Sequence, residues 1–539
     1  MAKESRRWLG LVFISVAVSL IIVDSTIVNV AVPSIVEELQ ITSTEVQWVQ
    51  EAYTLVFASL LLLFGAFADR FGRRRVMLIG VTVFAASSVL AGLAPNGELL
   101  ILARLVQGVG GAMILPTTLS LINSTFRGKE RGIAFAVWGS TIGGMAAVGP
   151  LLGGWLTTAF SWRWAFGINV PLGAIIIVGV LLTVAESRER VRRPIDGVGA
   201  LLSVFLFGFL VFGLIEGRSF GWWTTEEGLS IGGRTWPLSV SPIPFAFATS
   251  ALSLAAFIWW GLARARAGRS SLIDFSLFRT ASFRNGNVAA LVVSLGEFGI
   301  ILSLPLWLQF VLGFDALQVG FLLLALAAGS FFASGAAGAL SNRIPAVVIV
   351  RVGIAAEIVG IVWVGLIVGP DAAWGWLIPA LGVYGFGVGL ATAQLTGVVL
   401  QDIPVEQSGQ ASGTQSTARQ VGSALGVAIL GTVLFTTTSG LLGSSLDDAG
   451  APAAQRDQVV AAVVDSAGAA IDGLAADPAT ASYADAARAA FSDGTRASAF
   501  TAAGFLTIGL AATLALGGSR PSRREADGAG ERAAADATP

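Results

Sequence analysis

The sequence predicts an all-α polytopic membrane protein, and three observations lead to that prediction. Hydrophobic residues make up 54% of the 539 residues and charged residues only 12%, whereas an ordinary soluble domain has roughly 25% charged residues. The mean hydropathy is +0.77. The apolar residues form repeated runs of about 20, the length that a helix needs to cross a hydrocarbon core about 30 Å thick. A water-soluble fold is therefore excluded.

Fourteen apolar runs are long enough to be membrane spans. The first follows three basic residues and is too long for the core of a signal peptide, so we expect it to be retained. An even number of spans places both termini on the same side of the membrane. The expected spans cover residues 8–32, 47–68, 75–94, 99–123, 132–157, 163–185, 197–216, 244–263, 287–312, 317–340, 346–368, 374–400, 410–435 and 497–518.

Lysine and arginine are distributed unevenly between the two sides of these spans. If the termini are cytoplasmic, the inside segments hold 24 Lys and Arg and the outside segments hold 6. The positive-inside rule therefore predicts cytoplasmic termini and a multi-pass location in the plasma (inner) membrane.

A weak internal repeat suggests how the spans are organised. Gly65-Ala-Phe-Ala-Asp69-Arg70 closes the second expected span, and Gly338-Ala-Leu-Ser-Asn342-Arg343 closes the tenth. A duplicated six-span unit would produce this match. We expect an N-terminal six-helix bundle (1–190), two linker transmembrane helices with an outside hairpin-like loop (191–285), a C-terminal six-helix bundle (286–518) that includes an outside loop (436–496), and a disordered cytoplasmic tail (519–539).

The outside loop 436–496 is rich in alanine and acidic residues, with a helical tract expected from Val459 to Leu474. Its simplest interpretation is a solvated loop without transport chemistry.

Composition excludes several kinds of chemistry. The chain has no cysteine and no histidine, which removes disulfides, thiol nucleophiles and Cys/His metal sites. The only lysines are Lys3 and Lys129, and Lys129 stands in Gly-Lys-Glu, so no phosphate-binding loop is present. No clustered catalytic residues appear in the loops. We therefore expect no catalytic residues, no metal, no cofactor and no nucleic-acid partner, and a chain that is not an enzyme.

The loop after the second span has a specific pattern: Gly65, Asp69, Arg70, Gly72, Arg73, Arg74 and Arg75 occur in fixed order. Glycine allows close helix approach and the basic residues lie at a tight turn. This loop resembles the signature loop of the major facilitator superfamily.

Further motifs resemble the fourteen-span drug:proton antiporter branch of that superfamily. They are Asp24 to Pro33 in span one, Arg104 to Gly111 in span four, Gly149-Pro150-Leu-Leu-Gly153-Gly154 in span five, and Gly409 to Gly413 with Arg419 in span thirteen. The resemblance implies two six-helix bundles plus two extra central helices, and efflux by alternating access. Small residues at helical spacing in span five are explained equally well by ordinary helix packing.

The signature loop also suggests a gate. The N-terminal end of span thirteen, near Gly409, carries the positive helix dipole at the depth of Asp69. In an outward-open state we expect Asp69 to lie on that helix end and to pair with Arg131 or Arg73.

Charges inside spans are few and costly, at about 2.5 to 3.5 kcal/mol each. They are Asp24, Arg104, Glu297, Arg351, Glu357 and Arg419. Asp24 and Arg104 lie at similar depths and can pair. By the resemblance, Asp24, Arg104 and Glu297 face the transport route, whereas Glu357 is peripheral and is expected to be a packing or interface carboxylate. Arg351 and Arg419 lie near span ends and can snorkel; Arg419 is equally a candidate gate residue of the C-terminal half.

The function predicted from these features is proton-coupled efflux of small molecules, such as amphiphilic drugs or dyes, by a monomer in the lipid bilayer. Asp24 and Glu297 are the expected proton carriers, with Arg104 modulating Asp24; alternatively, Asp24 and Arg104 form only a structural pair. Export of a native metabolite, lipid or peptide stays open, as does a non-transporting membrane sensor or scaffold.

Overall fold

The computed structural model describes residues 2–41, 43–126, 128–187, 196–217, 220–225, 230–231, 234–269, 271–340, 343–403, 408–476 and 480–514. Within these ranges the chain is helical apart from one pair of two-residue strands. The prediction of an α-helical membrane protein is confirmed, because twelve described helices are long and apolar enough to cross a membrane. Helices α2 and α5, with 29 and 32 residues, are not among these twelve. A count of fourteen spans stays a prediction.

The N-terminal half is a bundle in which α4 packs against α2 and α3, and α1 packs against α5 and α7. Its helices are α1 (Ala2–Leu39), α2 (Ser43–Phe71), α3 (Arg73–Gly92), α4 (Gly97–Thr125), α5 (Gly128–Ala159), the short α6 (Arg163–Gly167) and α7 (Asn169–Thr183).

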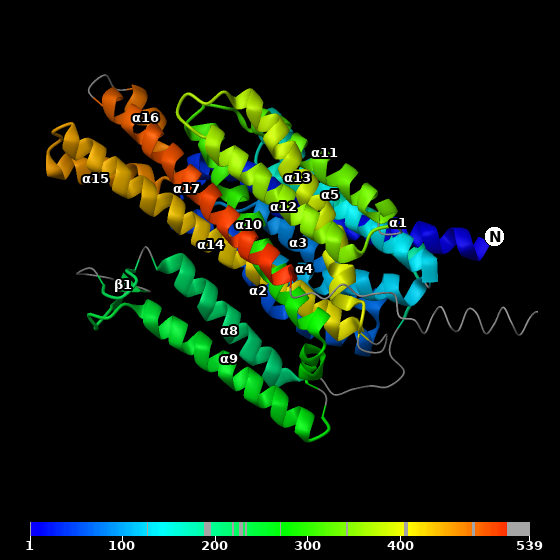
Figure 1. Cartoon of the computed structure of the whole chain (residues 1–539). Helices are drawn as coiled ribbons and strands as arrows, with labels where there is room; N and C mark the ends of the chain where they lie inside the picture. Colours follow the sequence, from blue (N-terminus) through cyan, green and yellow to red (C-terminus); the bar gives the residue numbers. More distant parts are fainter. Residues whose placement is uncertain are drawn as a thin grey trace, which may run out of the picture.

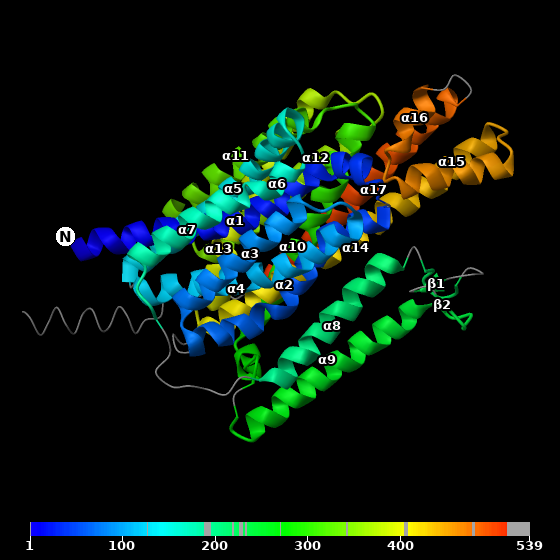
Figure 2. The ribbon, with the colours of Figure 1, turned by 180° about the vertical axis from the view of Figure 1, so that it is seen from behind.

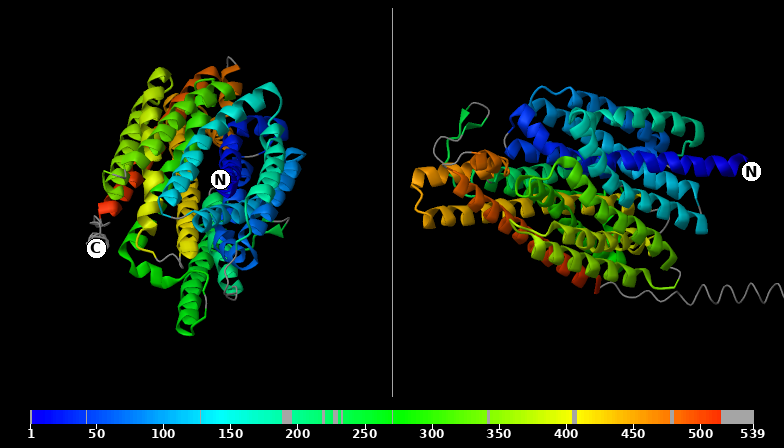
Figure 3. Two further views of the ribbon diagram at one scale, coloured as in Figure 1. Left: turned by 90° about the vertical axis from the view of Figure 1, so that its right-hand side faces the viewer. Right: turned by 90° about the horizontal axis from the view of Figure 1, so that it is seen from above.

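The C-terminal half repeats this arrangement: α13 packs against α11 and α12, and α10 packs against α14 and α17. Its elements are the 3-10 turn η1 (Phe275–Arg279), α10 (Ala281–Phe310), α11 (Ala316–Leu340), α12 (Ala346–Ile367), the 3-10 turn η2 (Trp374–Trp376), α13 (Leu377–Leu400), α14 (Ser408–Asp448) and α17 (Ala481–Leu514). The two halves lie side by side, one in blue to cyan and the other in green to red (Figure 3), and they meet where α5 packs on α11 and α2 on α14.

Helices α8 (Gly197–Glu216) and α9 (Pro242–Arg266) form an antiparallel pair outside the two bundles (Figures 1 and 2). Only α8 has extensive contacts with the bundles in the described part of the chain, and it packs on α2 and α14. Asp196 ties the pair together, because it caps α8 at the Gly199 amide and accepts a 2.8 Å hydrogen bond from Trp260 on α9. The connection between α8 and α9 contains the antiparallel strands β1 (Ser230–Ile231) and β2 (Arg234–Thr235).

The expectation of a solvated loop at 436–496 is wrong. Helix α14 continues to Asp448, α15 (Ala453–Asp465) and α16 (Ala470–Ala476) follow, and α17 begins at Ala481. These helices project at the end of the bundle opposite the N-terminus of α1 (Figure 1). Val463 and Ile471 are fully buried in the C-terminal core, which explains why an alanine-rich segment folds here.

The expected tract Val459 to Leu474 is divided into two helices by Ala467 and Gly468, whose φ angles are 54° and 103°. The predicted tail 519–539 lies outside the described residues.

Candidate functional site

Asp24 on α1 is the centre of a closed polar cluster inside the N-terminal half. Its Oδ2 accepts a 2.5 Å hydrogen bond from Arg104 Nη1 on α4. Its Oδ1 accepts from Gln107 Nε2 at 2.6 Å and from Asn169 Nδ2 on α7 at 2.7 Å. All four residues are buried. The structure therefore brings together the two charges that sequence reasoning placed at one depth, and it adds two amide donors.

The remaining donors of Arg104 are also used. Nε donates to the Val49 carbonyl at 3.0 Å, and the guanidinium carbon lies 4.6 Å from the centre of the Tyr53 ring. A Cβ on Gly108 would lie 2.6 Å from the Tyr53 carbonyl oxygen, so glycine at this position allows α4 to approach α2. The arginine-glycine motif of α4 is thus the structural support of the ion pair.

The orientation of this cluster corrects one expectation. Ser88 on α3 accepts hydrogen bonds from Gln107 at 2.9 Å and from Asn169 at 3.1 Å. Asp24 therefore points between α1, α3, α4 and α7, into the core of the N-terminal bundle, and its side chain is inaccessible to solvent. Asp24 and Arg104 do not face an open route in this conformation.

The C-terminal half holds a looser cluster around Glu297 on α10. Arg419 Nη2 on α14 lies 4.0 Å from Glu297 Oε2, and the Thr392 hydroxyl on α13 is a polar neighbour of the Glu297 side chain. The other oxygen, Oε1, has no donor among the described residues. Glu297 is buried, with 6% of its side chain exposed, so it too does not line an open route here. Arg419 does not only snorkel towards a span end, because it reaches the acid of a neighbouring helix.

Glu357 on α12 belongs to the same region. It is fully buried, and a Cβ on Gly387 of α13 would lie 2.7 Å from its Cγ. Neither of its oxygens has a donor in the part of the chain that the structure describes. The charges of Glu297 and Arg419 act on this carboxyl group. From the peripheral place of its span, Glu357 was expected to be a packing or interface carboxylate.

Sequence reasoning missed several polar residues near these clusters. Asn169 and Ser88 complete the shell of Asp24, but uncharged polar residues are common in spans and gave no signal. Glu51 on α2 is 3% exposed, with Oε2 unpaired among the described residues. An acid inside the expected span 47–68 was a signal that could have found it.

The signature loop is held by a residue outside the motif. Gly72 has a φ of 111°, a value that favours glycine, and a Cβ there would lie 2.7 Å from the Glu186 carboxyl carbon. Glu186 accepts hydrogen bonds from the backbone amides of Arg74 at 3.1 Å and Arg75 at 3.2 Å, at the positive end of the α3 dipole. Arg73 Nη1 donates to the Ser120 carbonyl at 3.5 Å.

The other residues of the expected gate give less information. The Arg70 guanidinium stacks on the Phe71 ring at 5.5 Å, and Gly65 would place a Cβ 3.8 Å from Pro116. The side chains of Asp69, of Arg131 and of the first residues of α14 around Gly409 lie outside what the structure describes, so the expected contacts of Asp69 stay a prediction.

The glycines of α5 face two different helices. A Cβ on Gly153 would lie 2.9 Å from the Ile27 carbonyl of α1, and Gly149 is packed against Thr26 on the same helix. A Cβ on Gly154 would lie 2.5 Å from the Ala316 carbonyl of α11 in the other half. The stripe is thus a packing surface that joins α1 of one half to α11 of the other.

The α5–α11 contact is close around Gly154. Gly320 on α11 would place a Cβ 2.9 Å from the Pro150 carbonyl. Further along the pair, a Cβ on Gly144 of α5 would lie 3.3 Å from the Phe331 ring of α11. The two halves therefore pack directly on each other along these two helices.

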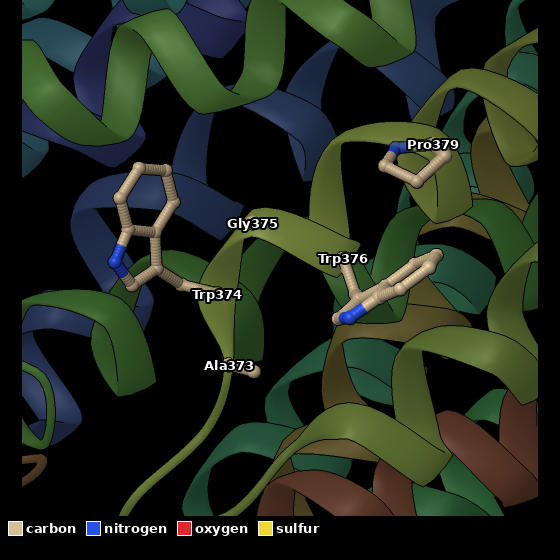
Figure 4. A pocket seen from close by; sticks show the side chains of 5 residues that line it. All are labelled: Ala373, Trp374, Gly375, Trp376 and Pro379. Atoms are coloured by element: carbon tan, nitrogen blue, oxygen red, sulfur yellow. The ribbon is translucent and has the colours of Figure 1, made fainter.

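Two hollows lie away from the charged clusters. One, of about 510 Å³, is lined only by residues 373–379, and Trp374 and Trp376 point to opposite sides of it (Figure 4). The other, of about 330 Å³, is an apolar groove between Trp48 on α2 and the phenylalanines of α8. Exposed tryptophans at a helix end are typical of a membrane interface, so the first hollow does not mark a central binding site. The second lies between α2 and α8, outside the two bundles.

Two helical bundles with buried charges among their long apolar helices define a helical membrane transporter. Residues 14–427 match the Major Facilitator Superfamily. The chain belongs to this superfamily.

Several relatives have roles in transport or resistance. A probable actinorhodin transporter of Streptomyces coelicolor is 32% identical over 483 residues, covering 85% of this chain and 79% of the relative. The multidrug resistance protein Stp of Mycobacterium tuberculosis is 31% identical over 460 residues, with coverage of 85% and 82%. The puromycin resistance protein pur8 of Streptomyces alboniger is 34% identical over 469 residues, with coverage of 85% and 87%.

Solved structures show the same fold. A bacterial homologue of the human lysosomal transporter Spinster, in an inward-facing and unoccupied conformation, matches with a TM-score of 0.56 and 19% identity over 95% of this chain and 97% of that chain. The human organic anion transporter MFSD10 matches with a TM-score of 0.55 and 13% identity, covering 94% and 98%.

Proposed function

We propose that this transporter exports small amphiphilic molecules in exchange for protons. The observation that carries the proposal is that each half holds a buried acid on its first helix, Asp24 on α1 and Glu297 on α10, with an arginine beside it. Charged residues at this depth are costly, and in membrane transporters they belong to ion and proton pathways. Relatives named for multidrug and puromycin resistance support drug-like substrates.

The coupling works through the environment of the acids. A guanidinium favours the ionised form of a neighbouring carboxyl group, whereas an apolar environment favours the protonated form. Rocking of the two halves changes the water access of Asp24 and Glu297 and their distances to Arg104 and Arg419. One charge crossing 100 mV supplies about 2.3 kcal/mol, and a pH gradient adds to it.

The test is transport by purified protein in proteoliposomes with an imposed pH gradient. A fluorescent cationic dye should accumulate on the acidic side, because antiport moves substrate against the proton flux. Asp24→Asn and Glu297→Gln should lose gradient-driven accumulation but keep substrate counterflow, which needs no net proton movement. Glu98→Gln, the same chemical change at an exposed position, is the control.

Two results would change this assignment. If both acid variants keep full gradient-driven transport, the coupling assignment is wrong. If Asp24→Asn lowers only the yield of folded protein, Asp24 and Arg104 form a structural pair. A wild-type protein that moves no substrate in any gradient favours a sensor or scaffold.

Export of a natural product is a second candidate for the substrate, favoured by the 32% identity to a probable actinorhodin transporter. Comparing an aromatic polyketide with a cationic dye in the same proteoliposomes distinguishes the two. The substrate with the higher initial rate at equal concentration identifies the preferred class.

We further propose that both termini are cytoplasmic, so that the α5–α11 contact around Gly154 lies towards the outside. The uneven distribution of Lys and Arg supports this orientation. The cysteine-free chain allows a direct test: Gln458→Cys on α15 should react with a membrane-impermeant maleimide in intact cells, whereas Ala265→Cys at the end of α9 should react only after permeabilisation. The reverse pattern contradicts the orientation.

A further inference from the structure

Glu357 lies at a close contact between α12 and α13 in the C-terminal half. Gly353 and Gly387 bring α12 and α13 together, and a Cβ on Gly353 would lie 2.7 Å from the Ala391 amide. The Glu357 side chain is enclosed by this contact and has no exposed surface. Both of its oxygens lack a hydrogen-bond donor among the described residues. A carboxylate ion in such a place would have lost its hydration without compensation.

The ionisable groups around Glu357 would carry a net negative charge if all of them were ionised. Two charged groups act electrostatically on Glu357: Glu297 from α10 and Arg419 from α14. The Tyr384 hydroxyl of α13 is in turn influenced by both acids. Arg419 is the single base in this group, and its described ion pair is with Glu297.

The other arginines near α12 are directed elsewhere. Arg351, on α12 itself, donates to the Thr513 carbonyl of α17 at 2.9 Å, and Arg496 of α17 donates to the Val368 carbonyl at 2.7 Å. Two acids therefore share one arginine, and the group is electrically neutral only when one of the acids carries a proton.

We propose that Glu357 is a second proton-binding residue of the C-terminal half and holds a proton in the conformation seen here. This inference rests on the proposed proton antiport and adds a carrier to it. Proton loss breaks the O–H bond of the Glu357 carboxyl group, and the proton passes to water that enters the opened half. The resulting carboxylate then competes with Glu297 for Arg419. Movement of α14, which carries Arg419 and packs on α2 of the other half, links this competition to the rocking of the two halves.

Infrared spectroscopy tests this directly, since a protonated carboxyl group has a C=O stretch separate from that of a carboxylate. The absence of histidine leaves carboxyl groups as the main titrating side chains between pH 5 and pH 8. We expect the wild-type protein to show a carboxylic C=O band in this range, and Glu357→Gln to lose one component of it. Glu98→Gln should leave the band unchanged.

Transport provides the second readout. Glu357→Gln should lose gradient-driven accumulation of the dye while keeping counterflow. A packing residue would give a different result, because glutamine preserves its shape: both transport modes would persist and the infrared band would be unchanged. That outcome overturns the proposal. If the glutamine variant is not recovered, Glu357→Asp is used, and it should shift the band; an unshifted band also overturns the proposal.

Failure of the proposed antiport gives a distinct pattern. A wild-type protein without gradient-driven transport but with a carboxylic band that Glu357→Gln removes would contradict antiport and leave Glu357 as a proton-binding residue. Gradient-driven transport that survives in Glu357→Gln together with an unchanged band would contradict only the role of Glu357.

Discussion

In the N-terminal half, the buried acid Asp24 accepts hydrogen bonds from Arg104, Gln107 and Asn169. In the C-terminal half, Glu297 keeps one oxygen and Glu357 keeps both oxygens without a donor among the described residues. Both regions are buried at membrane depth, so the difference does not come from solvent access. It comes from the number of donors that neighbouring helices supply.

This difference suggests that the two halves contribute unequally to coupling. A fully satisfied polar network makes a core rigid and specific, whereas unsatisfied buried groups are a frequent mark of function. We infer that the N-terminal cluster, besides the proton-carrying role proposed for Asp24, fixes the relative positions of α1, α3, α4 and α7. The acids of the C-terminal half are better placed to exchange protons, because fewer hydrogen bonds must break when they titrate.

The largest expected effect comes from the two arginines. Arg104→Leu removes one partner of a buried, hydrogen-bonded pair and should destabilise the fold by about 3–5 kcal/mol. Arg419→Leu should cost less than Arg104→Leu, because Arg419 lies 4.0 Å from its acid with 25% of its side chain exposed. Thermal unfolding in detergent measures both. Equal losses in melting temperature would contradict the proposed difference between the halves.

Removal of an uncharged hydrogen-bond donor should also destabilise the protein more in the N-terminal half than in the C-terminal half. The loss of stability should be smaller than for Arg104→Leu. Asn169→Ala removes one of the two donors of Asp24 Oδ1 and should cost about 1.5–3 kcal/mol, the usual range for hydrogen bonds to charged groups. Thr392→Val, which removes the hydroxyl at Glu297, leaves the size of the side chain unchanged and should cost about 0.5–1.5 kcal/mol.

A double-mutant cycle isolates the contribution of Asn169. Asn169→Ala should become much less costly when Asp24 is already asparagine, since the charged acceptor is then absent. An unchanged cost in that background would mean that Asn169 acts through packing and not through Asp24.

Sequence reasoning predicted how deep the charged residues lie in the membrane. It did not predict the direction in which their side chains point from the helix. The depths of Asp24 and Arg104 followed from counting residues at 1.5 Å per residue. The direction of Asp24 did not follow, because α1 is apolar on nearly all sides and its pattern defines no preferred face. The surroundings of Glu357 did not follow either: its position on a peripheral span said nothing about the glycine contact that brings α12 against α13.

Amino-acid composition also gave a wrong prediction of secondary structure where tertiary packing stabilises the helices. The segment 436–496 is polar enough to resemble a loop, yet Val463 and Ile471 bury its helices against the C-terminal core. Conversely, the α-helical class and the superfamily were predictable, since they depend on long apolar runs and on ordered motifs such as Gly65 to Arg75. Contacts between residues far apart in sequence, such as Glu186 with the Arg74 amide, required the structure.

The smallest expected effect concerns two helix ends at the membrane surface, where the two halves again differ in the hydrogen-bond partners that side chains supply. The N-terminus of α3 is capped by Glu186, whereas the corresponding helix of the other half, α12, begins at Pro345 without a side-chain cap. Glu186→Gln removes the charge from the helix end, which should cost about 0.3–1 kcal/mol. It also replaces one of the two acceptor oxygens by an NH2 group, which adds a loss that does not depend on charge. Because the site is partly exposed, the charge-dependent loss should shrink at high salt.

Melting temperatures at low and high salt measure this effect, with Asp371→Asn, an exposed acid in the turn that follows α12, as the control away from a helix N-terminus. A loss in Glu186→Gln that does not depend on salt would mean that hydrogen-bond geometry, and not charge, holds the signature loop. A loss above about 2 kcal/mol, the upper end for partly buried groups at a helix terminus, would show that Glu186 also fixes the strained turn at Gly72. In that case the loop and the end of α7 would move as one unit when the halves rock, because Arg74 also donates to the Leu181 carbonyl on that helix.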